Sequence, residues 1–413
     1  MKLTEENIID IKVRFKSLET VEQLAQLLSF IYNLKFPNRN KDKIILIEAK
    51  HLNYYAFNSQ GRYKEFSIKK KSGGERKISA PRYKLKTIQK CINELLNAIF
   101  TPHFTATGFV QNKSIVDNAK LHIDKQYVFN TDLKDFFPST EFGRVKAVLK
   151  LAPFFFTDNQ SYVKIENESP VKKGKGYLGF LIANLCCEKG GLPQGAPTSP
   201  TITNIVCQRL DKKLFKFAKS IKATYTRYAD DITFSSNKPV FDEKFKIKLV
   251  QIIEIEEKFK INFEKERLQK SGERQVVTGL VVNKKSNVER KYLKDIRFWL
   301  WCWGEYKTEK TQQKFLIQFP DKKGYLRYNG ATPQFQNYLS GKILFFGMVR
   351  GANDGLFLKF KTEFDRLNNL NKANEVQNPI EKNLNFTQPN FSLKNILDIW
   401  EKEGFEKAIN SFY

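Results

Sequence analysis

A short stretch with two adjacent aspartates constrains this chain more than any other feature. Residues 224–236 read TYTRYADDITFSS, with aromatic and β-branched residues on both sides of Tyr228-Ala229-Asp230-Asp231. Such residues favour strands and aspartate disfavours them, so the stretch predicts a tight β-hairpin that carries both carboxylates at its turn. Two like charges side by side repel each other and are costly to desolvate. A divalent cation would neutralise them.

Mg²⁺ suits such a pair, because it takes oxygen ligands from one or two carboxylates and completes its shell with water and substrate phosphates. A third carboxylate would allow two ions to bind side by side, as in two-metal phosphoryl transfer. We expect Asp132 to supply it, since YVFNTDLKDFFPST (residues 127–140) runs from a strand-like segment into this acid. For a bare Asp-Asp pair, the alternative is a solvated turn on a surface hairpin.

The charge of the chain indicates a polyanionic partner. Over 413 residues, 71 Lys and Arg exceed 44 Asp and Glu, which gives a formal net charge of +27. The excess is spread along the whole chain and so favours a long nucleic-acid footprint over a tail or a localisation signal. Solubility and a Lys/Asn/Phe-rich residue usage are the alternative sources of this charge.

Composition excludes several other classes. The five cysteines form no Cys-x-x-Cys pair and only three histidines are present, so neither a disulfide framework nor a zinc knuckle is predicted. No apolar run reaches the ~18–20 residues of a membrane span, and the N-terminus is charged throughout. We expect a cytoplasmic protein with no membrane partner and, at 41% hydrophobic residues, enough core for two or three domains.

Upstream of the acidic segments, a basic stretch predicts a hairpin that binds phosphate. FSIKKKSGGERKI (residues 66–78) has two strand-like pieces joined by Gly-Gly and includes Lys70 and Arg76. Arg grips phosphate oxygens bidentately and Lys acts as a point charge, so the hairpin suits a triphosphate or a nucleic-acid backbone. A solvated charged hairpin is equally compatible with the pattern.

Two further segments predict parts of a nucleotide pocket. In GGLPQGAPTSPTITNIV (residues 190–206), Gln194 offers an amide and Gly195 permits close backbone approach before a helix begins. The alternative for the same pattern is an ordinary turn followed by a core helix. Phe137 lies five residues beyond Asp132, where an aromatic ring could bar a ribose 2′-OH. Its alternative role is that of a core aromatic.

After the Asp-Asp hairpin, residues 241–259 predict an amphipathic helix that leads into INFEKERL, which contains Asn262 and Lys265. A lysine near a triphosphate could act as a general acid for the leaving pyrophosphate. A surface lysine is the alternative. The remaining sequence predicts short helices in residues 1–60, a helix at 84–100, a partly looped stretch at 150–189 and a helical, tryptophan-rich region from residue 289.

The order of these pieces resembles reverse transcriptases. Asp132 with its Phe-Phe pair, then LPQGAPTSP, then YADD, then Asn-x-x-Lys and a helical C-terminal part follow one another as in that superfamily, over about residues 60–370. Two signatures resemble those of the bacterial retron reverse transcriptases. NAKLH, from Asn118 to His122, matches their NAxxH signature, and Val277-Thr278-Gly279 matches their VTG signature.

The resemblance implies an α+β right-hand polymerase fold with fingers, an antiparallel palm sheet with helices, and a helical thumb. The predicted parts are an N-terminal helical region (1–60), fingers (61–125, with an insertion-like part at 150–189), palm (126–285), thumb (286–370), and a linker with a C-terminal helix (371–413).

The resemblance also implies an RNA-directed DNA polymerase that copies part of its own structured noncoding RNA. Such enzymes prime from a 2′-OH of that RNA, produce branched RNA-linked DNA, and serve with an effector protein in anti-phage defence. The implied partners are the noncoding RNA, the RNA–DNA hybrid, dNTPs and two Mg²⁺ ions. The thumb region is expected to recognise an RNA stem-loop.

The resemblance assigns roles by position. Asp132, Asp230 and Asp231 would bind the metals, and Lys265 would complete the catalytic group. The nucleotide would be bound by Lys70, Arg76, Phe137, Gln194 and Gly195. The signature residues, associated with RNA binding, are Asn118, His122, Val277, Thr278 and Gly279. Two alternatives remain: another bacterial defence or diversity-generating reverse transcriptase, and an RNA-binding scaffold that sequesters an effector.

Overall fold

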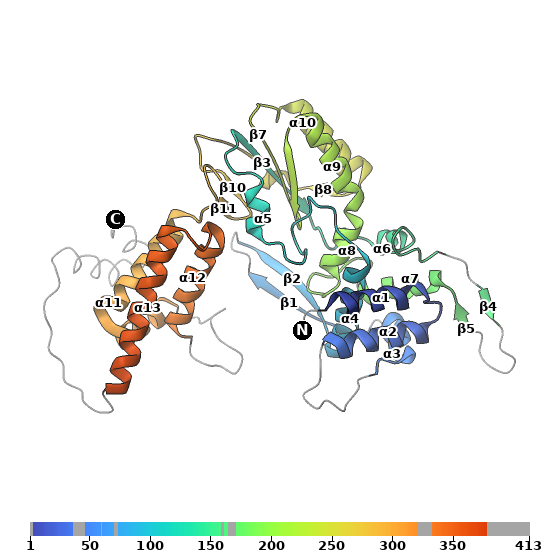
Figure 1. Ribbon diagram of the computed structural model, residues 1–413. Coiled ribbons are helices and arrows are strands. Elements are labelled where there is room, and N and C mark those ends of the chain that lie inside the picture. The colour runs from blue at the N-terminus through green and yellow to red at the C-terminus, as the bar shows by residue number, and fades with distance from the viewer. Residues whose placement is uncertain are drawn as a thin grey trace. The chain divides into compact units, whose positions relative to one another are not determined.

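The computed structural model describes residues 3–35, 46–58, 60–69, 73–157, 161–163, 171–319 and 333–377. The chain forms two compact units, Met1–Glu273 and Arg274–Tyr413. Figure 1 shows a mixed helical and antiparallel first unit and a second unit of helices with one small hairpin. The predicted α+β class is confirmed. The second unit begins earlier than the predicted thumb, while the finer limits of the predicted parts stay predictions.

The first unit is helical at its N-terminus, as the apolar spacing predicts. Its helices are α1 (Glu5–Lys16), α2 (Val21–Lys35), α3 (Ala49–Phe57), α4 (Tyr83–Ile99), α5 (Ile115–Lys120), α6 (Phe142–Leu149), α7 (Lys175–Cys186), α8 (Ser199–Val206), α9 (Gln208–Ser220) and α10 (Glu243–Val250). A π-helical turn extends α10 over Gln251–Glu256.

The central sheet is antiparallel and is built around one strand. Its strands are β3 (Tyr127–Lys134), β6 (Thr224–Tyr228), β7 (Asp231–Ser236), β8 (Lys260–Ile261) and β9 (Arg267–Lys270). The order is β6-β7-β3-β8, and β9 also pairs with β3. β3 is therefore paired on both sides and is buried along most of its length. The predicted hairpin at residues 224–236 is confirmed as β6 and β7.

The basic stretch forms the predicted hairpin. β1 (Tyr63–Lys69) pairs with β2 (Glu75–Pro81) in antiparallel register. Gly73 and Gly74 have φ angles of 85° and 77°, a region that glycine enters without the clash a Cβ would cause. Lys70 lies outside the described residues. A further pair of short strands is formed by β4 (Ser161–Val163) and β5 (Val171–Lys173).

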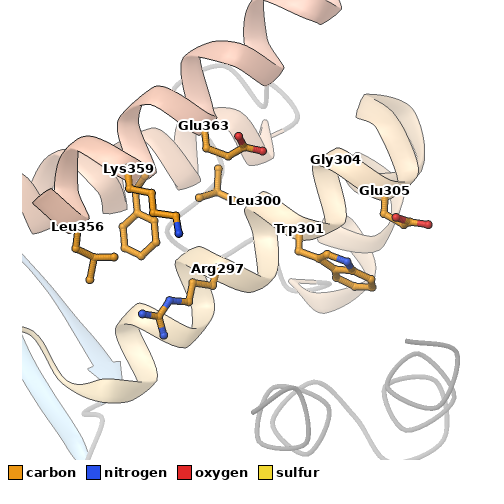
Figure 2. A pocket seen from close by; sticks show the side chains of 9 residues that line it. Arg297, Leu300, Trp301, Gly304, Glu305, Leu356, Lys359 and Glu363 are labelled. Atoms are coloured by element: carbon orange, nitrogen blue, oxygen red, sulfur yellow. The ribbon is translucent and has the colours of Figure 1, made fainter. Parts of the chain in front are cut away.

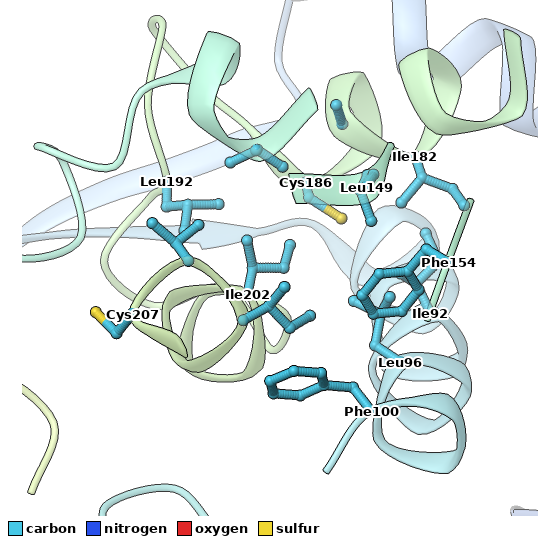
Figure 3. Close-up of a cluster of buried hydrophobic side chains, with 14 of the residues drawn as sticks. Ile92, Leu96, Phe100, Leu149, Phe154, Ile182, Cys186, Leu192, Ile202 and Cys207 are labelled. Atoms are coloured by element: carbon cyan, nitrogen blue, oxygen red, sulfur yellow. The ribbon is translucent and has the colours of Figure 1, made fainter. Parts of the chain in front are cut away.

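The core of the first unit lies where α4, α7 and α8 meet. Figure 3 shows this cluster, in which Leu96 and Phe100 lie at the end of α4, Ile182 comes from α7 and Ile202 from α8. The stretch at residues 150–189, expected to be partly looped and insertion-like, contains α7, whose leucine and isoleucine side chains are fully buried in this core. Its assignment as an insertion stays a prediction.

In the residues that the structure describes, the second unit combines a two-strand hairpin with three helices. They are β10 (Val276–Val277), β11 (Leu280–Val281), α11 (Arg290–Gln318), α12 (Phe335–Arg350) and α13 (Gly355–Gln377). Its core is aromatic, as in the edge-to-face contact of Trp303 with Phe335 at 5.1 Å between ring centres. Because α13 continues to Gln377, the predicted linker does not begin at residue 371. The rest of that predicted segment lies outside the described residues.

Two features bear on chemistry and location. All five cysteines are free and buried. Among the helices that the structure describes, none is both long enough and apolar enough to cross a membrane.

The burial of α7 makes a testable prediction. Leu181 is 0% exposed, so Leu181→Ala removes buried methyl groups and leaves a cavity, and we expect the free energy of unfolding to fall by about 2–5 kcal/mol. Leu151→Ala is the matched control, because Leu151 is 62% exposed. Urea titration of both variants checks the prediction. Equal stabilities would show that α7 is peripheral.

Candidate active site

The structure brings the three predicted carboxylates together at one end of the central sheet. Asp132 on β3 lies opposite Asp231, the first residue of β7, in antiparallel register. Asp230 occupies the turn between β6 and β7, and its carbonyl oxygen accepts a hydrogen bond of 3.1 Å from the backbone N–H of Leu133. Two segments that are distant in the chain therefore place their acids side by side.

The electrostatics of this site are unfavourable for three charged carboxylates. Burial and the nearby charge of Asp132 raise the pKa of Asp230. Burial of the carboxyl group and the charges of Asp230 and Asp132 likewise raise the pKa of Asp231, although the residue as a whole is exposed at the tip of the hairpin. Each shift means that the protein disfavours the charged form unless a positive charge is supplied.

Lys265 supplies one such charge. Its Nζ lies 2.8 Å from Oδ2 of Asp132, and the Nδ2 of Asn262 lies 3.5 Å from the same oxygen. The backbone N–H of Asn262 also donates to the Asp132 carbonyl oxygen at 2.8 Å. Although burial alone would lower the pKa of Lys265, the hydrogen bond to Asp132 and the charges of the aspartates raise it. Lys265 therefore contacts a carboxylate directly and stays protonated.

The donor set fits divalent cations. Within the described ranges, no group of three or more His, Cys, Asp or Glu side chains is already arranged to hold a metal ion. Lys265 engages one oxygen of Asp132, so that oxygen is already paired with a positive charge. Mg²⁺ binds through one or two carboxylates together with water and substrate phosphates, so a partial set of oxygen donors is what it requires. Asp132, Asp230 and Asp231 provide that set.

Part of the basic hairpin lies close to the carboxylates. The positive charge of Arg76, on β2, acts on Asp230 and opposes the rise of its pKa. Three residues further along β2, the strand contacts the predicted nucleotide loop. There the backbone N–H of Ser79 donates to the Gln194 carbonyl oxygen at 2.9 Å. Gly195 has φ 125°, and a Cβ there would lie 2.9 Å from Cγ2 of Ile78. Glycine is therefore required for this close approach.

The same loop also packs against the segment that follows Asp132. A Cβ on Gly191 would lie 2.5 Å from the Pro138 carbonyl oxygen, so the two backbones touch. Phe137, immediately before that proline, is half-buried and its ring centre lies 6.1 Å from that of Phe109. Phe109 is 47% exposed and was not predicted from the sequence. Gln194, Gly195 and Phe137 therefore lie in the same compact unit as the carboxylates, and of the predicted nucleotide-binding residues Arg76 is the one whose charge acts on Asp230.

The signature residues Asn118 and His122 need a correction. Both are 0% exposed, so neither presents an atom to RNA. The two ring nitrogens of His122 lie 2.7 Å from the hydroxyls of Ser235 and Thr226, and Asn118 Oδ1 accepts a bond of 2.8 Å from the Thr107 hydroxyl. A motif match located these residues correctly, but it did not show that they face inward.

The second signature forms a tight turn. Val277 is buried, while Thr278 and Gly279 have φ angles of 47° and 80° between the two strands of the β10–β11 hairpin. Positive φ at both central residues is the mark of a type I′ turn, whose twist matches that of a hairpin. The predicted RNA-binding role of these residues stays a prediction.

The second unit contains a pocket of about 450 Å³ between α11 and α13. Figure 2 shows Arg297 and Trp301 on one side and Lys359 and Glu363 on the other. Cationic side chains bind phosphates and aromatic rings stack on bases. The lining also includes the carboxylates of Glu305 and Glu363, so it combines two cationic and two acidic side chains with aromatic rings.

Comparisons with known proteins agree with this geometry. Residues 68–293 match the family described as "Reverse transcriptase (RNA-dependent DNA polymerase)". The Retron Mx162 reverse transcriptase of Myxococcus xanthus is 35% identical over 254 residues, which are 58% of this chain and 52% of that protein. The Retron Ec86 reverse transcriptase of Escherichia coli is 30% identical over 273 residues, which are 64% of this chain and 78% of that protein.

A solved telomerase from Candida albicans, in complex with a telomeric RNA fragment, is 13% identical, with a TM-score of 0.43 over 79% of this chain and 66% of that one. The chain spans about half the length of the Myxococcus relatives that it matches. The family match covers more than half of the chain, and the Escherichia coli relative is covered over most of its length. This chain therefore belongs to the reverse transcriptase family and, within it, to the retron reverse transcriptases.

The buried position of His122 makes a prediction that RNA contact would not. Burial lowers its pKa to about 3, so the ring stays neutral in the folded protein while an unfolded histidine titrates near about 6.5. The contribution of His122 to the free energy of unfolding is therefore complete at pH values above the unfolded pKa. It falls as the pH decreases below that pKa, by up to about 1.4 kcal/mol per pH unit. Carbon-13 NMR of histidine-labelled protein checks this, because the chain has only three histidines.

We expect the His122 signal, assigned with a His122→Gln variant, to remain that of a neutral imidazole down to about pH 5. A signal that titrates with the pKa of a solvated histidine would show that the ring is open to solvent and free to meet RNA.

Proposed function

We propose that this chain is an RNA-directed DNA polymerase of the retron type. The observation that carries the proposal is the register of β3 and β7, which sets Asp132 opposite Asp231 and beside the turn residue Asp230. Membership of the reverse transcriptase family supports the same reaction. Two Mg²⁺ ions held by these carboxylates would stabilise the attacking and leaving oxygens of phosphoryl transfer.

The other residues of the site have roles that follow from their chemistry. Arg76 would bind the triphosphate, since its charge already reaches the carboxylates. Lys265 keeps its proton because the neighbouring aspartates raise its pKa, so it can donate that proton to the leaving pyrophosphate. Gln194 and Gly195 would cradle the incoming nucleotide, and Phe137 would exclude a ribose 2′-OH. Lys70 would add a charge at the tip of its hairpin.

The partners follow from the family and from the charge. A net charge of +27 suits a noncoding RNA that serves as template and primer, and then the RNA–DNA hybrid. We propose that synthesis starts from a 2′-OH of that RNA and gives branched RNA-linked DNA, with dNTPs as substrates. The pocket between α11 and α13 is a candidate contact for an RNA stem-loop. Action in the cytoplasm, with an effector protein in anti-phage defence, completes the proposal.

The carboxylates can be tested by variants that keep the shape of the side chain. We expect Asp230→Asn to lower the rate of primer extension on an RNA template by at least about 10²–10³-fold, the loss typical of removing one charge-stabilising group. The melting temperature should stay the same or rise, because the variant removes one of three neighbouring negative charges that repel each other.

Asp135→Asn is the matched control for that experiment. Asp135 is exposed in the same motif, and its φ of 49° suits asparagine. It should retain activity. Full activity of Asp230→Asn would contradict the assignment of this site.

Phe137 makes a prediction about sugar selectivity. Phe137→Ala removes the half-buried ring that we place beside the sugar. We therefore expect incorporation of ribonucleotides, relative to dNTPs, to rise by about 10-fold or more, because one lost steric or hydrophobic contact is worth ~1–3 kcal/mol. Single-nucleotide extension with each rNTP and dNTP measures this. Phe109→Ala, which alters the neighbouring ring, is the comparison, and unchanged selectivity in Phe137→Ala would assign the gate to another residue.

A further inference from the structure

A buried ion pair lies directly beneath the turn that carries Asp230 and Asp231. Arg227, on β6, and Asp211, on α9, are both 0% exposed. The pair is bidentate, with Nε to Oδ1 at 2.8 Å and Nη2 to Oδ2 at 2.6 Å. Replacing a buried ion pair by apolar residues is often neutral or stabilising, so stability alone does not explain its presence. The other contacts of Arg227 show what it holds.

Arg227 reaches from its strand to the backbone of the turn. Its Nη1 donates to the Ala229 carbonyl oxygen at 3.0 Å. Ala229 has φ 58°, a left-handed conformation that is unfavourable for alanine and persists only where the surroundings impose it. The carbonyl of Ala229 belongs to the peptide that leads into Asp230. The guanidinium therefore fixes the peptide that orients the first aspartate.

The loop at residues 105–109 makes a second contact with the turn. A Cβ on Gly108 would lie 2.2 Å from the Ala229 nitrogen, so the loop and the turn are in backbone contact. Asn204 on α8 joins the two features, since its Nδ2 donates to the Gly108 carbonyl oxygen at 3.0 Å and its Oδ1 accepts from Arg227 Nη2 at 3.1 Å. Arg227, Asn204 and Gly108 thus enclose the turn residue Ala229.

The ion pair affects the aspartates by fixing the position of the turn, and not through its own net charge. Asp211 neutralises the guanidinium at contact distance, and it also accepts a hydrogen bond of 2.7 Å from the Tyr225 hydroxyl. The positive charges that act on Asp230, and oppose the rise of its pKa caused by burial and by Asp132, are those of Lys265 and Arg76. Loss of Arg227 would leave the repulsion between the aspartates unchanged and would remove the tether that resists it.

We propose that Arg227, held by Asp211 and linked through Asn204 to Gly108, is a positioning device for the metal-binding turn. It contacts no substrate, and it keeps the Ala229–Asp230 peptide in the one orientation that presents Asp230 and Asp231 toward Asp132. The inference rests on the proposed polymerase function, because the value of a fixed turn is the convergence of the three carboxylates.

Two variants disturb the device in different ways. Gly108→Ala leaves the ion pair intact and pushes on the Ala229 nitrogen. The double variant Asp211→Leu/Arg227→Met removes the pair without leaving an unpaired buried charge, and so avoids the main cause of misfolding. Gly143→Ala, on α6, is the matched control, since no atom lies within 4 Å of the added Cβ.

The full chain is assayed for primer extension, for binding of an RNA template–primer duplex, and for binding of Mn²⁺ alone by electron paramagnetic resonance. In Gly108→Ala and the double variant we expect the extension rate to fall by about 100-fold, the effect of a small misplacement of reacting groups. Mn²⁺ binding should weaken, while duplex binding changes little and both variants remain folded. The melting temperature of Gly108→Ala should fall, because its Cβ would lie 2.2 Å from a backbone nitrogen that must move. Gly143→Ala should match the parent chain in every measurement.

The outcomes separate the two claims. An inactive parent chain, or an Asp230→Asn variant as active as the parent, would overturn the proposed function. An active parent with folded variants that keep its extension rate and its affinity for Mn²⁺ would overturn the positioning role. Should the double variant unfold, Gly108→Ala decides alone, because it changes no charged or hydrogen-bonding side chain.

Discussion

Repulsion among three neighbouring carboxylates is the constraint on which the rest of the first unit depends. Burial and mutual charge raise the pKa of Asp230 and Asp231, so the folded chain holds these groups in positions that electrostatics alone would disfavour. The ladder between β3 and β7, together with the bond from Leu133 to the Asp230 carbonyl, keeps them in place. Strain of this kind at a site is tolerated when the surrounding frame is rigid, and a cation that bound there, as we propose, would meet ligands that the protein has already positioned.

Close backbone approaches provide much of that rigidity. Gly191 touches Pro138, Gly195 touches Ile78 and Gly108 touches Ala229, and each contact would be blocked by a Cβ. The first two join the nucleotide loop to the segment after Asp132 and to the basic hairpin. The third joins a loop to the turn that carries Asp230 and Asp231. These contacts connect elements that no strand ladder connects, so the site is assembled by glycine packing as well as by the sheet.

Much of this site could be predicted from the sequence, because its main signals are local. Acids at strand ends, a Gly-rich loop before a helix and a Gly-Gly turn each have their own short pattern, and the structure places them in one unit. Burial and partner choice are not local properties. The inward orientation of His122, the pairing of Lys265 with Asp132 and the burial of Arg227 against Asp211 depend on which elements pack together. A charged residue within a β-rich run was the signal that could have drawn attention to Arg227.

The buried signature residues have a physical explanation once their partners are known. His122 joins β6 and β7 through Thr226 and Ser235, and a neutral imidazole suits this place because it donates at one nitrogen and accepts at the other. A charged ring would donate twice and would be buried without a counter-charge. The hydroxyl of Thr107 lies 2.8 Å from Asn118 Oδ1 and 3.1 Å from the Arg227 carbonyl oxygen, so these two acceptors share its one proton. Both residues therefore contact the hairpin whose tip carries the aspartates, His122 directly and Asn118 through Thr107. Their place in the family signature is explained by this structural role and needs no contact with RNA.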